Sequence, residues 1–228
     1  MTLLFFLLLS SCFSSKNIIQ AHSSLTLGEL QIFCPSENAS ECETRINTNK
    51  GSATRIKWND NYFWLTAAHV CEPQTTEDPK YITKERLLLV SIAGSGKQET
   101  IQYYRLDTKW DICILVANPG PARKLAKKIP ASGESVTAIA FPGGVFDKQM
   151  YPIYDGRWIG YHKAEDKCLS TIPVTGGSSG AAILNNNGEI VSIITSVMKS
   201  FNHFTMATCL DDLTMFLHEF ASLVPQAK

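Results

Sequence analysis

The fold is decided by the stretch Tyr62-Phe63-Trp64-Leu65-Thr66-Ala67-Ala68-His69. Aromatic and apolar residues typical of a strand lead into a threonine and two alanines, and a histidine follows directly. Small residues allow a short, tight helix to pack against a barrel while the imidazole faces a cleft. A single histidine is more often buried in a core than catalytic, so the interpretation needs support from the rest of the chain.

Turn signals on both sides of this stretch divide the chain into short strands. Residues 54–58 alternate polar and apolar side chains, and the turn at 59–61 joins them to the next strand, which predicts a hairpin. Further strands are predicted over 87–92, 101–106 and 112–116, and over 135–141, 157–161, 169–174, 181–184 and 190–195. A linker containing prolines and a glycine, within 118–130, separates the two strand-rich halves.

In the last segment, the spacing of the apolar residues changes from the two-residue period of a strand to the period of a helix. Apolar residues at 213, 216, 217 and 220 follow Asp211 and Asp212, which favour a helix N-terminus. We therefore predict an all-β fold of two six-stranded-type β-barrels with a C-terminal α-helix. The expected parts are a lead-in over 23–40, barrels over 41–120 and 135–210, a linker over 121–134 and the helix over 211–223.

The N-terminal residues 1–22 are predicted to be a signal peptide. Leu3 to Leu9 is an apolar run too short to span a bilayer as a helix, but it matches the core of a secretory signal. The following Ser10-Ser11-Cys12 completes a sequence that resembles a bacterial lipobox, whose cysteine carries lipid, while cleavage near Ala21 is the competing prediction. We expect an exported protein, secreted or periplasmic; if the lipobox prediction holds, a lipid anchor at Cys12 is its only membrane contact, and if cleavage occurs near Ala21 it has none.

Composition excludes several classes of function. The 228 residues carry 21 basic and 21 acidic side chains, so the net charge is zero and offers no electrostatic capture of nucleic acid. No pair of cysteines has zinc-binding spacing, so we expect neither a metal nor another cofactor.

Six cysteines follow Cys12 and allow fifteen complete pairings. Cys34 and Cys42 could close a small loop, and Cys113 could be a buried thiol.

A candidate nucleophile lies in the sequence Gly176-Gly177-Ser178-Ser179-Gly180. A serine hydroxyl needs an imidazole to accept its proton, and the imidazole needs an acid to orient it. Ser179 is the better nucleophile because a glycine lies two residues before it and another directly after it. The turn can point the N–H groups of Gly177 and Ser179 into one hollow. A plain glycine–serine turn is the alternative.

The candidate acid is Asp111, directly before the apolar run 112–115. Burying a carboxylate there is costly unless a partner such as an imidazole N–H pairs with it. Asp107 is the alternative acid, and His162 and His203 are weaker alternatives to His69.

In the order His, Asp, Ser, these settings resemble the chymotrypsin-like (trypsin-fold) serine peptidases, and most closely the small bacterial and HtrA-like members. Thr66 to His69 resembles the family's Thr-Ala-Ala-His element, 111–115 its Asp-Ile-Ala-Leu-Leu strand, and 177–180 its Gly-x-Ser-Gly motif. The resemblance covers roughly residues 45–215.

The resemblance implies a serine endopeptidase that hydrolyses protein or peptide substrates through an acyl-enzyme. His69 would be the general base and then acid, Asp111 would orient it, and Ser179 would attack. The N–H groups of Gly177 and Ser179 would hold the oxyanion. The segment Thr195, Ser196 and Val197 would pair with an extended substrate. A catalytically inactive binding module on the same fold is the alternative function, and an α/β-fold esterase is disfavoured because its order would be Ser, acid, His.

The chain departs from the family pattern in three places. Ser178 stands where digestive members have an aspartate that pairs with a new N-terminus, so we expect no zymogen activation. The chain ends soon after the predicted helix, so we expect no PDZ domain. The motifs do not assign the wall of the specificity pocket, but Pro173 and Ser192 supply no charge for a basic or acidic side chain, which predicts a preference for small or apolar side chains.

Overall fold

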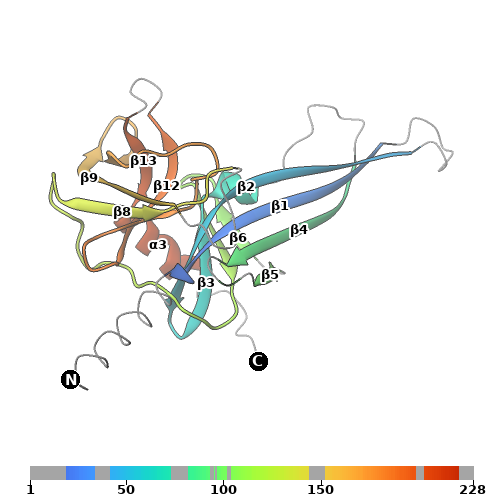
Figure 1. The fold of residues 1–228 in the computed structure, drawn as a ribbon, viewed down its shortest axis with the longest axis horizontal. Helices are drawn as coiled ribbons and strands as arrows, with labels where there is room; N and C mark the ends of the chain where they lie inside the picture. The colour runs from blue at the N-terminus through green and yellow to red at the C-terminus, as the bar shows by residue number, and fades with distance from the viewer. Residues whose placement is uncertain are drawn as a thin grey trace, which may run out of the picture.

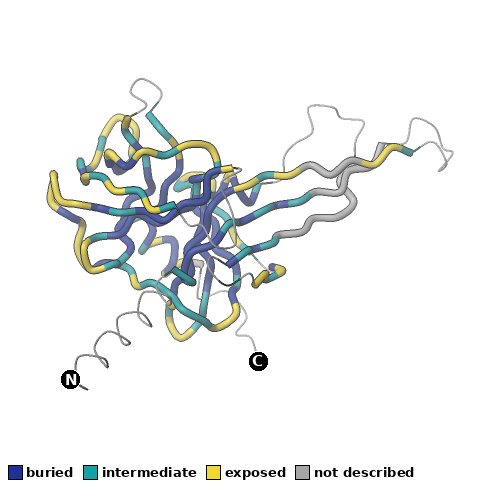
Figure 2. Tube along the Cα trace, viewed as in Figure 1, coloured by how far each residue is buried: buried dark blue, intermediate teal, exposed yellow. Residues whose placement is uncertain are grey.

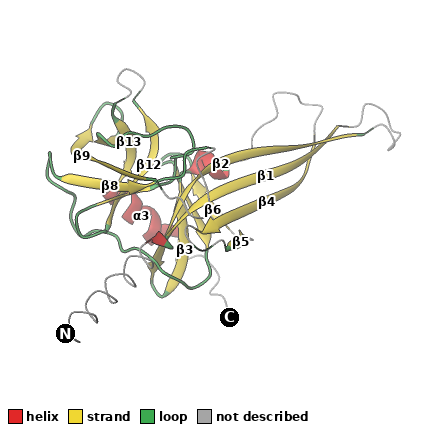
Figure 3. Ribbon diagram, in the orientation of Figure 1, coloured by secondary structure: helices red, strands yellow, loops and turns green. Residues whose placement is uncertain are grey.

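A computed structural model describes residues 19–33, 42–72, 82–92, 95, 97–101, 104–143, 152–198 and 203–220. Strands dominate two units that lie side by side (Figures 1 and 3). The helices described are α2 (Ala68–Cys71), one turn long, and α3 (Leu210–Phe220) near the C-terminus. The predicted all-β fold with a C-terminal helix is confirmed.

The first unit is a curled seven-stranded sheet with the order β5-β4-β1-β2-β3-β7-β6. Its strands are β1 (His22–Phe33), β2 (Glu43–Trp58), β3 (Asn61–Thr66), β4 (Ile82–Ile92), β5 (Gln98–Ile101), β6 (Tyr104–Asp107) and β7 (Ile112–Val116). The predicted hairpin is present, because β2 and β3 pair antiparallel. The sheet is a half-barrel rather than a closed barrel, since the short edge strands β5 and β6 pair only with β4 and β7. Strands β1, β2 and β4 continue past the body as an arm (Figure 1).

Strand β1 lies largely within the expected lead-in 23–40, for which the sequence predicted no strand. It lies between β2 and β4 and pairs antiparallel with both. Leu25 and Leu27 are buried, as a strand period of two requires. Ser23, on the same face of the strand, is also buried. Because one of the inward-facing side chains is a polar serine, the alternation of apolar residues that predicts a strand is incomplete here. Ala21 and His22 are buried too, so the fold begins inside the segment expected as a signal peptide.

The second unit is a closed barrel with the order β10-β13-β12-β11-β8-β9. Its strands are β8 (Ser135–Ile139), β9 (Ile153–His162), β10 (Lys167–Ser170), β11 (Ala182–Leu184), β12 (Ile190–Val197) and β13 (Thr205–Cys209). Pairing of β9 with β10 closes the ring, which confirms the second predicted barrel. A closed barrel has no unpaired edge and is filled by its own side chains, here including the fully buried Trp158.

A shared apolar core joins the two units and the C-terminal helix. Phe63 and Ile112 of the first sheet and Ile193 of the barrel belong to one buried cluster, together with Phe216 and Leu217 of α3. Buried residues accordingly concentrate where the units meet (Figure 2). Burying a large apolar side chain contributes about 1.5–3 kcal/mol, so this cluster fixes the two units relative to one another.

Disulfides within the described residues settle part of the cysteine pairing. Cys71 is bonded to Cys113, and Cys168 to Cys209. Cys113 is therefore not the buried thiol that the sequence suggested. Cys42 is also disulfide-bonded, while Cys34 lies outside the described residues.

The apolar run 3–9 and Cys12, expected as parts of a signal and a lipid anchor, also lie outside the described residues. Of the helices that are described, none has both the length and the apolar character needed to cross a membrane.

Candidate active site

His69 is the one exposed residue of helix α2. Ala68, Val70 and Cys71 are buried in the core of the first unit, while the His69 side chain keeps 43% of its surface accessible. The strand β3 ends at Thr66, and one turn of helix then directs the imidazole outward. This is the arrangement predicted from the small residues that precede the histidine.

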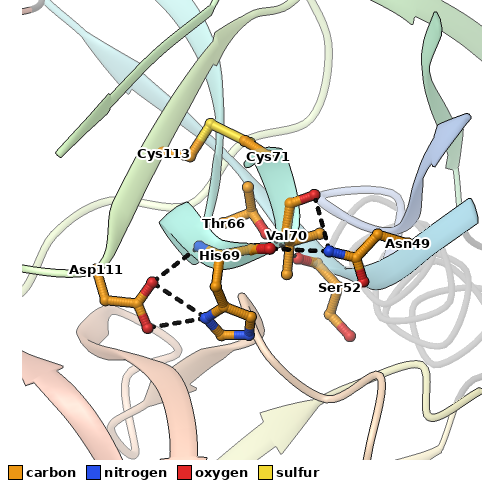
Figure 4. Close-up of a disulfide and its surroundings, with 8 residues drawn as sticks. All are labelled: Asn49, Ser52, Thr66, His69, Val70, Cys71, Asp111 and Cys113. Carbon is orange, nitrogen blue, oxygen red and sulfur yellow. Dashed lines mark hydrogen bonds and ion pairs between the residues drawn. A yellow bond between two sulfur atoms is a disulfide. The ribbon is translucent and has the colours of Figure 1, made fainter. Parts of the chain in front are cut away.

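Asp111 binds His69 through both its carboxylate oxygens. The backbone N–H of His69 donates to Oδ1 at 3.0 Å, and the ring Nδ1 lies 2.9 Å from Oδ2 and 3.1 Å from Oδ1 (Figure 4). A carboxylate only accepts, so Nδ1 carries the hydrogen and Nε2 of the neutral ring has a free lone pair. Asp111 has φ of +55°, a left-handed conformation that aspartate tolerates better than most residues.

The pairing shifts the pKa of both groups. The hydrogen bond that His69 donates to Asp111 raises the pKa of His69, against the opposing effect of partial burial. Burial opposes ionisation of Asp111, but the hydrogen bonds and charge of His69, together with the charge of Lys167, outweigh it and lower the pKa of Asp111. Asp111 is thus a carboxylate at neutral pH, which favours a positive charge on His69.

The alternative acid, Asp107, has a different role in the structure. Its Oδ1 accepts the backbone N–H of Trp110 at 3.1 Å and so closes the turn that precedes β7. The second unit fixes the same turn, because Lys167 Nζ donates to the carbonyl oxygen of Trp110 at 3.3 Å and the Thr208 hydroxyl donates to it as well. Contacts from both units therefore determine where Asp111 lies.

Ser179 lies in a tight turn that two glycines make feasible. Gly177 and Gly180 have φ of +91° and +88°. A Cβ on Gly180 would lie 2.1 Å from both the Ser52 carbonyl oxygen and Thr66 Oγ1, so no side chain fits there. The buried Ser178 closes the turn locally: its N–H donates to the Thr175 carbonyl at 3.0 Å.

Strand β2 contacts both parts of the candidate site. The amide of Asn49 donates to the His69 carbonyl oxygen at 2.8 Å (Figure 4), and the N–H of Ser52 donates to the Ser179 carbonyl oxygen at 2.7 Å. A Cβ on Gly51 would lie 2.9 Å from that Ser179 oxygen. The sequence motifs did not indicate Asn49, because a polar residue on a long strand carries no local signal.

The hydroxyl of Ser179 does not bind His69 in this structure. It donates to the carbonyl oxygen of Thr195 at 3.2 Å, and among the described residues no hydrogen bond joins Ser179 to His69. Thr195 in turn donates its own hydroxyl to the Met206 carbonyl at 3.2 Å. The backbone N–H groups of Gly177 and Ser179 donate to no described acceptor, so both are free to bind an anion.

The other candidate histidines are placed elsewhere in the chain. His162 ends strand β9, and His203 lies between β12 and β13. Over the described ranges, no three His, Cys, Asp or Glu side chains lie together in a way that would hold a metal ion.

A pocket of about 410 Å³ opens beside Ser179. Its lining includes Thr195, Ser196 and Val197, the three residues predicted to contact substrate. The remaining lining residues are Val174, Thr175, Gly176, Ser178, Ser179 and Ile194, and none of the nine carries a charged side chain. The pocket therefore suits a neutral group. Another pocket, of about 340 Å³ around Arg55 and Pro119, contains no candidate catalytic residue.

The sequence of residues 51–193, more than half of the chain, matches the model of the trypsin-like peptidase domain. The chain belongs to the trypsin-like peptidase family. The matched region contains His69, Asp111 and Ser179 of this trypsin-like peptidase. No curated protein sequence matches the chain, so the family assignment depends on the domain match.

Solved structures with the same fold include bacterial serine proteases. The serine endoprotease from Yersinia pestis superposes with a TM-score of 0.62 at 15% identity, covering 90% of this trypsin-like peptidase and 65% of that chain. This peptidase thus spans less than two thirds of that relative. The active form of the Rv3671c protease from M. tuberculosis gives 0.61 at 15% identity, with coverages of 88% and 81%. The HtrA-type protease AlgW with a decapeptide superposes with a TM-score of 0.67 at 16% identity, and the match covers 92% of this peptidase and 67% of that chain. The TM-scores establish a common fold, and at identities this low the likeness shows the fold alone.

Proposed function

We propose that this trypsin-like peptidase is a serine endopeptidase with Ser179 as nucleophile, His69 as general base and acid, and Asp111 as the orienting acid. The observation that carries the proposal is the His69–Asp111 pair, which holds Nδ1 protonated and leaves Nε2 able to accept a proton. An imidazole with that tautomer is what a serine hydroxyl needs in order to become a nucleophile.

The proposed reaction has two halves. Ser179 Oγ attacks the substrate carbonyl carbon and its proton passes to His69 Nε2, giving a tetrahedral intermediate whose oxyanion accepts from the N–H groups of Gly177 and Ser179. The C–N bond then breaks, and His69 gives the proton to the departing amine. His69 then takes a proton from water as its oxygen adds to the acyl carbon; the bond from that carbon to Ser179 Oγ breaks, His69 returns the proton to Oγ, and the carboxylic acid product leaves.

The resting serine has to turn before it can react. Its hydroxyl gives up the hydrogen bond to the Thr195 carbonyl, a contact that contributes about 1 kcal/mol, and rotates toward His69. This cost is small beside the barrier that the site has to lower, and catalytic hydrogen bonds are commonly loose in the absence of substrate.

The proposed substrates are protein segments in extended conformation. Thr195, Ser196 and Val197 end strand β12 and line the pocket beside Ser179, so an added strand would place one side chain in that pocket. The fold relative AlgW was solved with a decapeptide, which supports a peptide substrate for this chain as well. The uncharged lining supports a small or apolar side chain before the cleaved bond.

We place the enzyme outside the cytoplasm. The two disulfides support this location, because such bonds persist in oxidising compartments. A signal peptide in the first residues and a lipid anchor at Cys12 complete the proposal.

Labelling with a fluorophosphonate probe tests the proposal. We expect the folded protein to be labelled at Ser179 and to hydrolyse casein, and the Ser179→Ala variant to do neither while unfolding at a similar temperature. Ser178→Ala is the matched control and should still be labelled. The Ser179–Thr195 hydrogen bond favours the second candidate, an inactive binding module, and a folded protein that never reacts with the probe would establish that alternative.

A further inference from the structure

The disulfide Cys71–Cys113 repeats the spacing of the His69–Asp111 pair. Each cysteine lies two residues after one member of the pair, and both pairs are 42 residues apart in sequence. The disulfide joins the last residue of α2 to the second residue of β7, with the two Cα atoms 6.5 Å apart. Figure 4 shows it beside the His69–Asp111 contacts.

Helix α2 is held by few hydrogen bonds, although Val70 and Cys71 near its C-terminal end are packed in the core. It is one turn long, its first turn has no side-chain cap, and its closing backbone bond runs from Glu72 N–H to the Ala68 carbonyl at 2.9 Å. A single turn of helix is not stable without tertiary contacts. Its start is fixed by the pairing of Thr66 with Cys113 across β3 and β7. Its end is fixed by the amide of Asn49 and by the disulfide.

We propose that the Cys71–Cys113 disulfide is a positioning element that holds the imidazole of His69 in register with the carboxylate of Asp111. The inference rests on the serine peptidase function proposed above. Both cysteines are fully buried, so the bond acts through packed, solvent-free contacts rather than through chemistry with substrate.

The size of the effect follows from the geometry of sulfur. Two bonded sulfurs lie about 2.05 Å apart, whereas non-bonded heavy atoms pack at about 3.5–4.0 Å. Reduction to two thiols would therefore push the sulfurs roughly 1.5 Å further apart, whereas alanine at both positions would leave the space of the sulfurs empty; either change lets α2 shift against β7. A displacement of about 1 Å in a catalytic constellation can cost about 100-fold in rate.

The second disulfide provides a matched control. Cys168–Cys209 has a sequence separation of 41, against 42 for Cys71–Cys113, so the two bonds constrain the unfolded chain to a similar degree. It joins β10 to β13, strands that already pair with each other inside the closed barrel. None of the three candidate triad residues belongs to these strands, whose contacts with the site include those of Lys167 and Thr208 with the Trp110 carbonyl oxygen.

The experiment compares Cys71→Ala/Cys113→Ala with Cys168→Ala/Cys209→Ala in the full chain. For the first variant we expect kcat to fall about 10- to 100-fold, with KM within about twofold, and the acidic limb of the pH–rate profile to move to lower pH. That shift is expected because a weaker contact with Asp111 no longer raises the pKa of His69. The control variant should lose stability, and its kcat should fall clearly less than that of the first variant, because the pairing of β10 with β13 still holds Lys167 and Thr208 against the Trp110 carbonyl oxygen. Equal losses of kcat in the two variants would overturn the inference.

A second variant and a second measurement keep the two proposals separate. Cys71→Val/Cys113→Ala fills the space without the bond and is used if the alanine pair does not fold. Titration of the His69 ring by NMR needs no turnover, so it tests positioning even if the wild-type protein proves inactive. An unchanged His69 titration in the variant contradicts the positioning role, whereas an inert wild type contradicts the proposed function.

Discussion

Ser52 donates its backbone N–H to the carbonyl oxygen of Ser179 at 2.7 Å, and this hydrogen bond crosses from the first unit to the second. The hydroxyl of Ser52 adds a second crossing, because it donates to the Gly177 carbonyl at 2.9 Å and accepts the Phe141 N–H at 2.9 Å. One buried serine thus fixes the turn that carries the proposed nucleophile and one of the proposed oxyanion donors.

Ser52→Ala should loosen that turn. The change leaves the buried Phe141 N–H without this partner, which costs about 1–3 kcal/mol, and it removes the hydrogen bond to the part-buried Gly177 carbonyl, which costs less. We expect a loss of about 2 kcal/mol or more in the free energy of unfolding, measured in urea, and a lower kcat. Ser135→Ala, which removes an exposed acceptor of Arg157, should change stability by less than about 0.5 kcal/mol. Wild-type stability in Ser52→Ala would show that the hydroxyl is not needed.

Gly180→Ala should be among the most damaging single changes in the chain. Its φ of +88° strains any side chain, and the new Cβ would lie 2.1 Å from the Ser52 carbonyl oxygen and from Thr66 Oγ1. Gly133 has the same φ, but a Cβ added there would meet nothing within 4 Å, so Gly133→Ala measures backbone strain alone. We expect about 1 kcal/mol of destabilisation at Gly133 and at least about 3 kcal/mol more at Gly180. Similar losses in thermal unfolding of both variants would refute the steric explanation.

Proteolytic activity should rise with pH through the titration of His69. The contact with Asp111 raises the pKa of His69 above its usual 6.5, and the base works only when neutral, so the midpoint of kcat/KM should lie above that value. Asp111→Asn removes the charge and should lower both the midpoint and, by several powers of ten, the rate. Glu134→Gln, far along the chain in an exposed turn, serves as the control for a general loss of negative charge. A midpoint that does not respond to Asp111→Asn would mean that another group titrates.

His22 should make the fold sensitive to acid. It is fully buried, and burial together with the charge of Arg123 lowers its pKa to about 3. Its neutral Nε2 accepts the Nε–H of Arg123 at 3.2 Å, and Nδ1 donates to Thr54 Oγ1 at 3.1 Å. The folded pKa is depressed, so the stability from neutral His22 is complete above about pH 6.5 and is lost as the pH falls toward 3.

The measurement is the free energy of unfolding at several pH values for the wild type and for His22→Gln. We expect the variant to be less stable at neutral pH, because glutamine reproduces the hydrogen bonds imperfectly, and to lose less stability between pH 6.5 and about pH 3. Parallel pH dependences in the two proteins would exclude His22 as the acid-sensitive group.

Local patterns were sufficient for much of the architecture and for the candidate residues. The β2–β3 hairpin and the terminal helix follow from period and turn residues over a few positions, which is information that a short stretch carries. Strand β1 could not be predicted in the same way, because its inward residues include Ser23 and its partners β2 and β4 come later in the chain.

The sequence by itself determined the family motifs: the small residues before His69, the aspartate before an apolar strand, and the glycines around Ser179. Only the tertiary structure decided which groups meet. It brought Asp111 rather than Asp107 to the imidazole, paired Cys71 with Cys113, and turned the Ser179 hydroxyl to Thr195. The physical reason is that a motif sets the local backbone, whereas a contact between residues far apart in sequence depends on how two units pack over a common core.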